Sequence, residues 1–245
     1  MNIEKMLKNQ KLPKAVILSS DIYPESENTL TNLGIEVIYS FENKNVHPAL
    51  SKHVDMQIVS LTDNKIICAP ETFGYYSHAL KKFPVKLIKG DTYLSSNYPG
   101  DIAYNITVTE KCAVHNFKHT DRALMENIGN VDWVDVSQGY CGCTLCKIAD
   151  DAFITADRGV GKALKEKGYD VLLISGKDIL LPGFNEGFIG GSTFMISPNV
   201  LCVNGNIKKC PDFGIIVDFC SKYDVEILSL SDNLIMDIGS GICVG

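Results

Sequence analysis

A thiol, an imidazole and two carboxylates of this sequence could together perform nucleophilic chemistry. Cys243 lies in the terminal segment GSGICVG, His53 and Asp55 belong to the motif HVD, and Asp101 ends the motif PGD. A cysteine that attacks a resonance-stabilised carbon needs a proton donor, and paired carboxylates can bind a planar cation through bidentate hydrogen bonds. Cys243, His53 and the pair Asp55 and Asp101 could supply a nucleophile, a proton donor and a binding group for a small polar or cationic ligand.

Each of these residues also has a purely structural interpretation. A cysteine in an apolar terminal strand is often a small buried hydrophobic residue, and His53 could hydrogen-bond the entry to a strand. Asp55 and Asp101 could each make a strand-start hydrogen bond. We assign the two aspartates to matching positions of two repeats, where equivalent side chains of a symmetric ring would converge on its axis.

Three further cysteines, Cys141, Cys143 and Cys146, lie close together in YCGCTLC. They are weak candidates for a zinc or iron–sulfur site, because zinc usually takes four ligands and the usual spacing is a pair of C-x-x-C motifs. On an extended strand Cys141 and Cys143 would share a face, and Cys146 would point the opposite way. The sequence therefore predicts no metal and no cofactor, and the nine cysteines are expected to be reduced and mostly buried.

The composition excludes several classes of protein. With 45% apolar and 21% charged residues the chain is typical of globular proteins, and a net charge of −6 gives no basic surface for nucleic acid. The sequence contains neither an apolar stretch of membrane-spanning length nor a signal-peptide pattern. We therefore expect a cytoplasmic protein whose partner is a small molecule, not nucleic acid or a membrane.

Short apolar runs alternate with helical patterns roughly every 45 residues, a period typical of repeat architectures. In the clearest unit, strand patterns over Met56 to Leu61 and KIICAP precede a helical pattern, ETFGYYSHALKKF, and a third strand, VKLIKG. This order is a ββαβ unit. The expected units span residues 53–97, 98–138, 139–186 and 187–232, and a fifth combines residues 233–245 with residues 15–52, after an N-terminal extension of residues 1–14.

The repeats predict one α/β domain over residues 1–245, built as a five-bladed β/α propeller with pseudo-fivefold ββαβ repeats. The N-terminal segment would complete the fifth unit, and closure would remove exposed sheet edges. The alternative is an open doubly wound parallel sheet, which two adjacent strands for each helix fit poorly.

This organisation resembles the pentein fold of arginine deiminase, agmatine deiminase, dimethylarginine hydrolase and amidinotransferase, which modify guanidino groups. More closely, QGYCGCTLCKI, AFITADRGVGKAL, DVLLISG, GFIGGSTF and MDIGSG are similar to a family of uncharacterised bacterial proteins with this fold, DUF6873. The resemblance implies a nucleophile at Cys243, a proton-transferring histidine at His53, and acidic residues that hold a guanidinium at Asp55 and Asp101. The order of these motifs differs from that of the enzymes, because the unit before Cys243 carries GGSTF without a histidine or carboxylate.

Three functions are consistent with these features. The first is a ligand-binding protein with cysteine-dependent hydrolysis or deimination of an amidine or guanidine. The second is a non-catalytic binding or scaffold protein of the same fold, which the altered motif order favours. The third is a metal–thiolate protein built on Cys141, Cys143 and Cys146.

Overall fold

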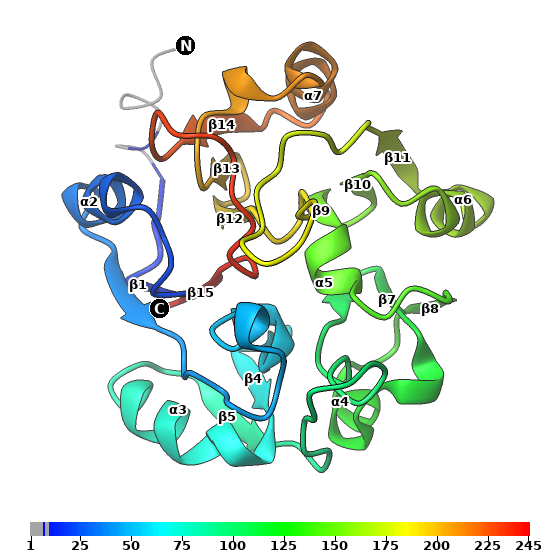
Figure 1. Cartoon of the computed structure of the whole chain (residues 1–245). Helices are drawn as coiled ribbons and strands as arrows, with labels where there is room; N and C mark the ends of the chain where they lie inside the picture. Colours follow the sequence, from blue (N-terminus) through cyan, green and yellow to red (C-terminus); the bar gives the residue numbers. More distant parts are fainter. Residues whose placement is uncertain (1–6, 8–9) are drawn as a thin grey trace.

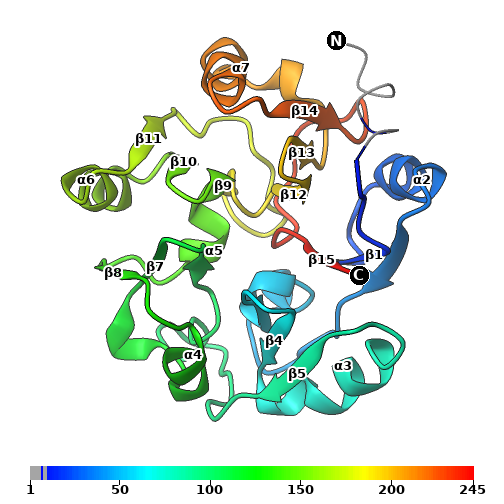
Figure 2. The same cartoon turned by 180° about the vertical axis from the view of Figure 1, so that it is seen from behind.

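The computed structural model describes residue 7 and residues 10–245, and this part of the chain forms five three-stranded sheets. Residues 1–6, 8 and 9 of the expected N-terminal extension lie outside the described residues. The sheets are arranged around a common centre, with helices on the outside (Figures 1 and 2). In their order of pairing, the strands of the first sheet are β15 (Ile242–Val244), β1 (Ala15–Leu18) and β2 (Glu36–Tyr39), those of the second are β3 (Ile58–Ser60), β4 (Lys65–Cys68) and β5 (Lys86–Lys89), and those of the third are β6 (Thr107–Val108), β7 (Cys112–His115) and β8 (Asp132–Asp135). The strands of the fourth sheet are β9 (Cys146–Ala149), β10 (Ala152–Thr155) and β11 (Asp170–Leu173), and those of the fifth are β12 (Thr193–Ser197), β13 (Val200–Val203) and β14 (Glu226–Ser229).

Every sheet repeats one pattern of pairing. The middle strand pairs antiparallel with the strand on one side and parallel with the strand on the other. Parallel neighbours need a crossover connection, and a helix provides it in each sheet. The ββαβ prediction is therefore confirmed, and the open parallel sheet is excluded for the described residues. The crossover helices are α2 (Pro24–Asn32), α3 (Phe73–Ala79), α4 (Arg122–Asn127), α6 (Arg158–Glu166) and α7 (Phe213–Ser221), and a further short helix, α5 (Cys141–Thr144), lies near the centre in Figure 1.

The sheet β15–β1–β2 joins two distant parts of the chain. Ala15 of β1 faces Val244 of β15 in an antiparallel pair, and β1 pairs parallel with β2 on its other side. The C-terminus therefore lies beside β1 in Figure 1. The sequence-based prediction that these two segments are hydrogen-bonded side by side is confirmed.

The apolar core consists largely of clusters between neighbouring sheets. Successive residues of a strand point to opposite faces, so a middle strand contributes alternately to the cluster on each side. This explains why the middle strands are largely buried on both faces and consist mainly of apolar residues. The five junctions are represented by the pairs Val16 with Cys202, Ile17 with Ile66, Ile67 with Ala113, Val114 with Phe153, and Ile154 with Leu201.

Two predicted strands are wrong in part. The strand expected over Ile102 to Val108 is limited to Thr107–Val108, because the preceding residues form turns in which Asn105 N–H bonds the Ile102 carbonyl. The expected strand CTLCKIAD begins only at Cys146, because Cys141–Thr144 form the helical turn α5. Both differences concern the segments that lead to the centre of the molecule.

His115 on β7 gives the fold a pH-dependent stability. Its ring is buried, with Nδ1 2.7 Å from the Thr120 hydroxyl, and its Nε2–H donates to the Gly139 carbonyl at 3.0 Å. Burial lowers the pKa of His115 to about 4. In the unfolded chain the imidazole binds a proton near its ordinary pKa of about 6.5, so acid favours the unfolded state.

We expect the free energy of unfolding to fall by about 3 kcal/mol between roughly pH 6.5 and pH 4 because of His115, beyond the loss caused by other groups. Urea unfolding of the parent chain and of His115→Gln across this range would measure the difference. Equal losses in the two proteins would contradict the assignment to His115.

Candidate functional site

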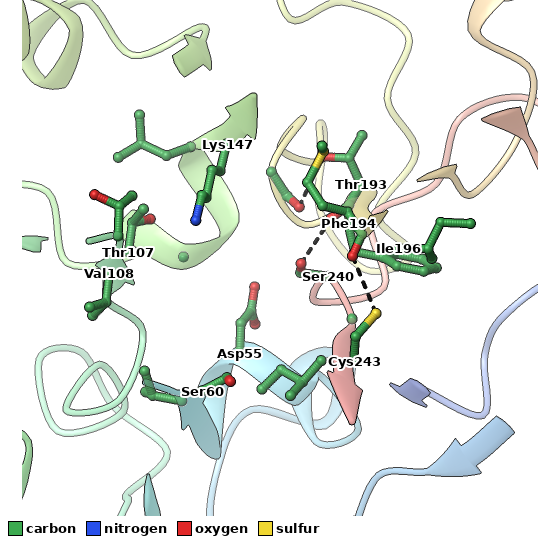
Figure 3. A pocket seen from close by; sticks show the side chains of 18 of the residues that line it. Asp55, Ser60, Thr107, Val108, Lys147, Thr193, Phe194, Ile196, Ser240 and Cys243 are labelled. Atoms are coloured by element: carbon green, nitrogen blue, oxygen red, sulfur yellow. Dashed lines mark hydrogen bonds between the residues drawn. The ribbon is translucent and has the colours of Figure 1, made fainter. Parts of the chain in front are cut away.

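A central pocket of about 820 Å³ lies where the five sheets meet. The strands β3, β6, β9, β12 and β15 all line it, so that every sheet contributes one edge strand. Figure 3 shows Ser60, Thr107, Lys147, Phe194 and Cys243 around the pocket. The predicted axial pocket is thus present in the described part of the chain.

Asp55 is a carboxylate on the lining of this pocket. It lies in the 3-10 turn Val54–Met56 that leads into β3, and its backbone N–H donates to the Gly239 carbonyl at 3.1 Å. The carboxylate projects between the strands in Figure 3. Its Oδ1 atom is buried and has no hydrogen-bond partner.

A buried cluster of titratable side chains extends from Asp55 away from the pocket lining. The Cys143 thiol donates to Asp55 Oδ2 at 2.9 Å, and the ligand atoms of His53, Asp55 and Cys143 all lie within 4.8 Å of one another. His53 and Cys143 do not themselves line the pocket. The structure therefore unites the predicted residues His53 and Asp55 with Cys143, which the sequence suggested only as a weak metal ligand.

Asp237 is a member of this cluster that the sequence reasoning missed. Its Oδ1 lies 3.8 Å from His53 Nδ1, and its carboxylate accepts backbone N–H groups of Phe188 at 2.8 Å and Gly239 at 3.0 Å. Gly191 packs against it so closely that a Cβ atom would overlap the carboxylate. An acidic residue inside the apolar run LIMDIGSG was the available signal, because a buried charge needs specific partners.

Asn105 holds the thiol in place and was also missed. Its Nδ2 donates to Cys143 Sγ at 3.1 Å, and its Oδ1 accepts the Cys143 backbone N–H at 3.2 Å. Asn105 belongs to the segment expected to be a strand. The turn before β6 is therefore what brings this amide to the centre.

The cluster is poor in positive charge. Burial, reinforced by the nearby Asp237, raises the pKa of Asp55 to about 7, and burial also raises the pKa of Asp237. Burial lowers the pKa of His53, while burial and then the Asp55 charge raise the pKa of the Cys143 thiol well above its ordinary value. Among the described residues, no lysine or arginine forms an ion pair with either carboxylate. A cation that binds in this cluster would therefore meet two carboxyl groups that have no lysine or arginine partner.

Cys243, the predicted nucleophile, lines the pocket from β15 but lies outside the buried cluster. Its thiol donates to the Met195 carbonyl at 3.2 Å, and burial raises its pKa to about 12. Among the described residues, this hydrogen bond goes to a backbone carbonyl, and Cys243 is not grouped with an imidazole or a carboxylate. Its catalytic role remains a prediction.

Asp101 is not brought to the pocket. Its Oδ2 accepts the Tyr140 hydroxyl at 2.7 Å, while its Oδ1 is buried without a partner. The irregular segment 102–106 separates Asp101 from β6, whereas the turn of Asp55 leads almost directly into β3. Asp55 and Asp101 therefore do not occupy matching positions, and their predicted convergence on the axis does not occur.

The three neighbouring thiols have different surroundings. Cys141 donates to the Gln138 carbonyl at 3.3 Å, Cys143 contacts Asp55, and Cys146 packs in the apolar cluster with Ile154. The expectation that Cys141 and Cys143 share a strand face is wrong, because both lie in the helical turn α5. All nine cysteines lie within the described residues and are unpaired, and eight are buried, as expected for reduced thiols.

Five ββαβ sheets around a central pocket define the pentein fold. The family of unknown function DUF6873 matches residues 17–242. The chain belongs to this family.

Solved structures share the fold at low sequence identity. The inosamine-phosphate amidinotransferase of Streptomyces griseus is 11% identical, with a TM-score of 0.56 over 91% of this chain and 89% of that one. DDAH from Pseudomonas aeruginosa, solved with citrulline, is 10% identical, with a TM-score of 0.54 over 91% and 93%. The agmatine deiminase of C. jejuni is 12% identical, with a TM-score of 0.52 over 90% and 88%.

No curated protein sequence is significantly similar to the chain. Within the described residues, every helix is too short or too polar to span a membrane.

Proposed function

We propose that this protein binds a small amidine- or guanidine-bearing cation in the central pocket and hydrolyses or deiminates it with a cysteine. One observation carries the proposal. The pocket-lining Asp55 carboxylate accepts a hydrogen bond from the Cys143 thiol, with His53 beside the pair. Thiol, imidazole and carboxylate are the groups that such chemistry requires.

The cation would bind at Asp55. The Oδ1 atom of this carboxylate has no hydrogen-bond partner, and no lysine or arginine of the described residues forms an ion pair with Asp55. A planar amidine offers two parallel N–H donors that match a carboxylate, and a charge-assisted pair of this kind is stronger than a neutral hydrogen bond. A pocket of about 820 Å³ is within the usual range for a small-molecule site.

The chemistry would then proceed at the thiol behind Asp55. Cys143 transfers its proton to the Asp55 carboxylate, and its sulfur forms a bond to the amidine carbon. The carbon–nitrogen bond to the leaving amine breaks as that nitrogen takes up a proton from the Asp55 carboxyl group. Water then cleaves the carbon–sulfur bond, which returns the thiol and releases the hydrolysed product. Cys243 is the second candidate nucleophile, since it lines the same pocket.

Release of ammonia or urea from a panel of guanidino and amidino compounds tests the proposal, with Cys143→Ser and Cys243→Ser as a matched pair. We expect Cys143→Ser to lose at least about a thousandfold in kcat/KM and Cys243→Ser to stay within about threefold of the parent chain. The opposite result would assign the reaction to Cys243. Equal turnover by the parent and both variants would refute a cysteine mechanism.

A non-catalytic binding protein is the second candidate function. The observation that favours it is that Cys143 is buried and does not line the pocket itself. Amidine binding that depends on Asp55, without turnover of any compound in the panel, would identify this function.

We further propose that the five sheets form a closed five-bladed propeller and that residues 1–245 are one domain. The pairing of β15 with β1 and the apolar cluster at each sheet junction support closure. A cytoplasmic location and the absence of nucleic-acid and membrane partners stay predictions.

A further inference from the structure

The buried cluster offers one nitrogen, one oxygen and one sulfur ligand to a common point. The donor atoms of His53, Asp55 and Cys143 lie within 4.8 Å of one another. We propose that these three residues bind a divalent, thiolate-preferring cation of the Zn²⁺ type. The same residues take part in the proposed hydrolysis, but metal binding by them does not depend on whether the protein hydrolyses an amidine.

The cluster contains unsatisfied polar atoms. His53 Nδ1 and Asp55 Oδ1 are buried and have no hydrogen-bond partner, although both residues are at least nine-tenths buried. The separation of 3.8 Å between His53 Nδ1 and Asp237 Oδ1 is too long for a hydrogen bond. Leaving a buried polar atom unpaired is energetically unfavourable. A cation would accept a lone pair from each of these atoms.

The ligand types and charges of the cluster match those that zinc prefers. Imidazole nitrogen, carboxylate oxygen and thiolate sulfur are the ligands that zinc uses, and three protein ligands with one open position are typical of non-structural zinc sites. A thiolate and the Asp55 carboxylate would balance the two charges of the ion. Asp237, next to His53, would lie outside the ligand set as a further negative group.

Hydrogen bonds and close packing hold the three ligand residues in place in the metal-free protein. Asn105 bonds both the thiol and the backbone N–H of Cys143, and the Asp55 N–H is bonded to the Gly239 carbonyl. Gly239 packs on His53 so closely that a Cβ atom there would overlap the histidine. Because Asp55 also lines the central pocket, the pocket gives an ion a path to the cluster.

Titration of the chelator-treated full chain with Zn²⁺ against a chromophoric chelator tests the site. We expect one Zn²⁺ per chain and an affinity at least about 100-fold weaker in Cys143→Ser and in His53→Ala. Cys146→Ser and Cys243→Ser are matched controls, because these thiols lie outside the cluster, and should bind like the parent. Equal loss in a control variant, or no binding by the parent, would overturn the proposal.

A spectroscopic measurement on the unmodified chain keeps the test decisive if a variant fails to fold. Co²⁺ bound at this site should show a thiolate charge-transfer band together with the intense visible bands of four-coordinate cobalt. A Co²⁺ complex without the thiolate band would refute the assignment of Cys143. Amidine turnover measured in the presence of a chelator reports on the hydrolase proposal alone, so the two failures can be told apart.

Discussion

Replacement of Asp55 by asparagine is expected to weaken amidine binding in the central pocket strongly and, at the same time, to stabilise the metal-free fold. Asparagine keeps the shape of the side chain and an acceptor for the Cys143 thiol, but it removes the charge that would pair with the cation. Loss of one partner of a buried charge pair costs several kcal/mol, so we expect affinity to fall at least about 100-fold. Isothermal titration of the chelator-treated parent and variant with benzamidine or guanidinium would measure this difference in affinity.

The gain in stability has a separate physical origin. In the ligand-free protein the buried Asp55 carboxylate lies near Asp237 without a basic partner, and a buried unpaired charge is costly. We expect Asp55→Asn to raise the free energy of unfolding by about 1–3 kcal/mol at pH 8. Opposite changes in affinity and stability are typical of a residue retained for function.

Asp101→Asn is the matched control for this experiment. Asp101 is also a buried aspartate with one unpartnered oxygen, but it bonds Tyr140 and does not line the pocket. The Asp101→Asn variant should bind benzamidine with the same affinity as the parent chain. If Asp55→Asn binds normally and Asp101→Asn does not, the cation site proposed at Asp55 is wrong and the sequence-based role of Asp101 is right.

Deletion of residues 242–245 is the second large effect that we expect, because it removes strand β15. The deletion exposes the edge of β1, whose four residues are all buried, and it removes the buried Val244. Three lost strand pairs and one buried apolar side chain together amount to about 4 kcal/mol or more. This is a large share of the roughly 5–15 kcal/mol that stabilises a typical protein.

We expect the shortened chain to be largely unfolded or aggregated at 37 °C, since an unpaired strand edge also invites association. Circular dichroism and light scattering would follow both outcomes. Ile242→Val and Cys243→Ser keep the strand backbone and should unfold close to the parent. A deleted chain that is monomeric and as stable as the parent would show that the pairing of β15 contributes little.

The sequence alone determined the local elements and their order. The middle strands are runs such as KIIC and VLCV that are buried on both faces, and glycine, proline and polar turns separate them from helices with regular apolar spacing. These signals act over a few neighbouring residues, so they can be recognised without knowing the fold. The repeat of the pattern also predicted the shared sheet of the two chain ends, because each end carried only part of a unit.

The composition of the candidate site was decided by the tertiary structure. His53 and Asp55 were predicted, but their neighbour is Cys143 and not Cys243, and Asp237 and Asn105 complete the cluster. These side chains come from turns in different units, and a shift of one or two residues in such a turn decides which side chain points to the centre. Asp101 shows the effect, because the irregular segment after it turns its carboxylate to Tyr140. Distances between remote turns depend on how the units pack, and no local pattern in the sequence encodes them.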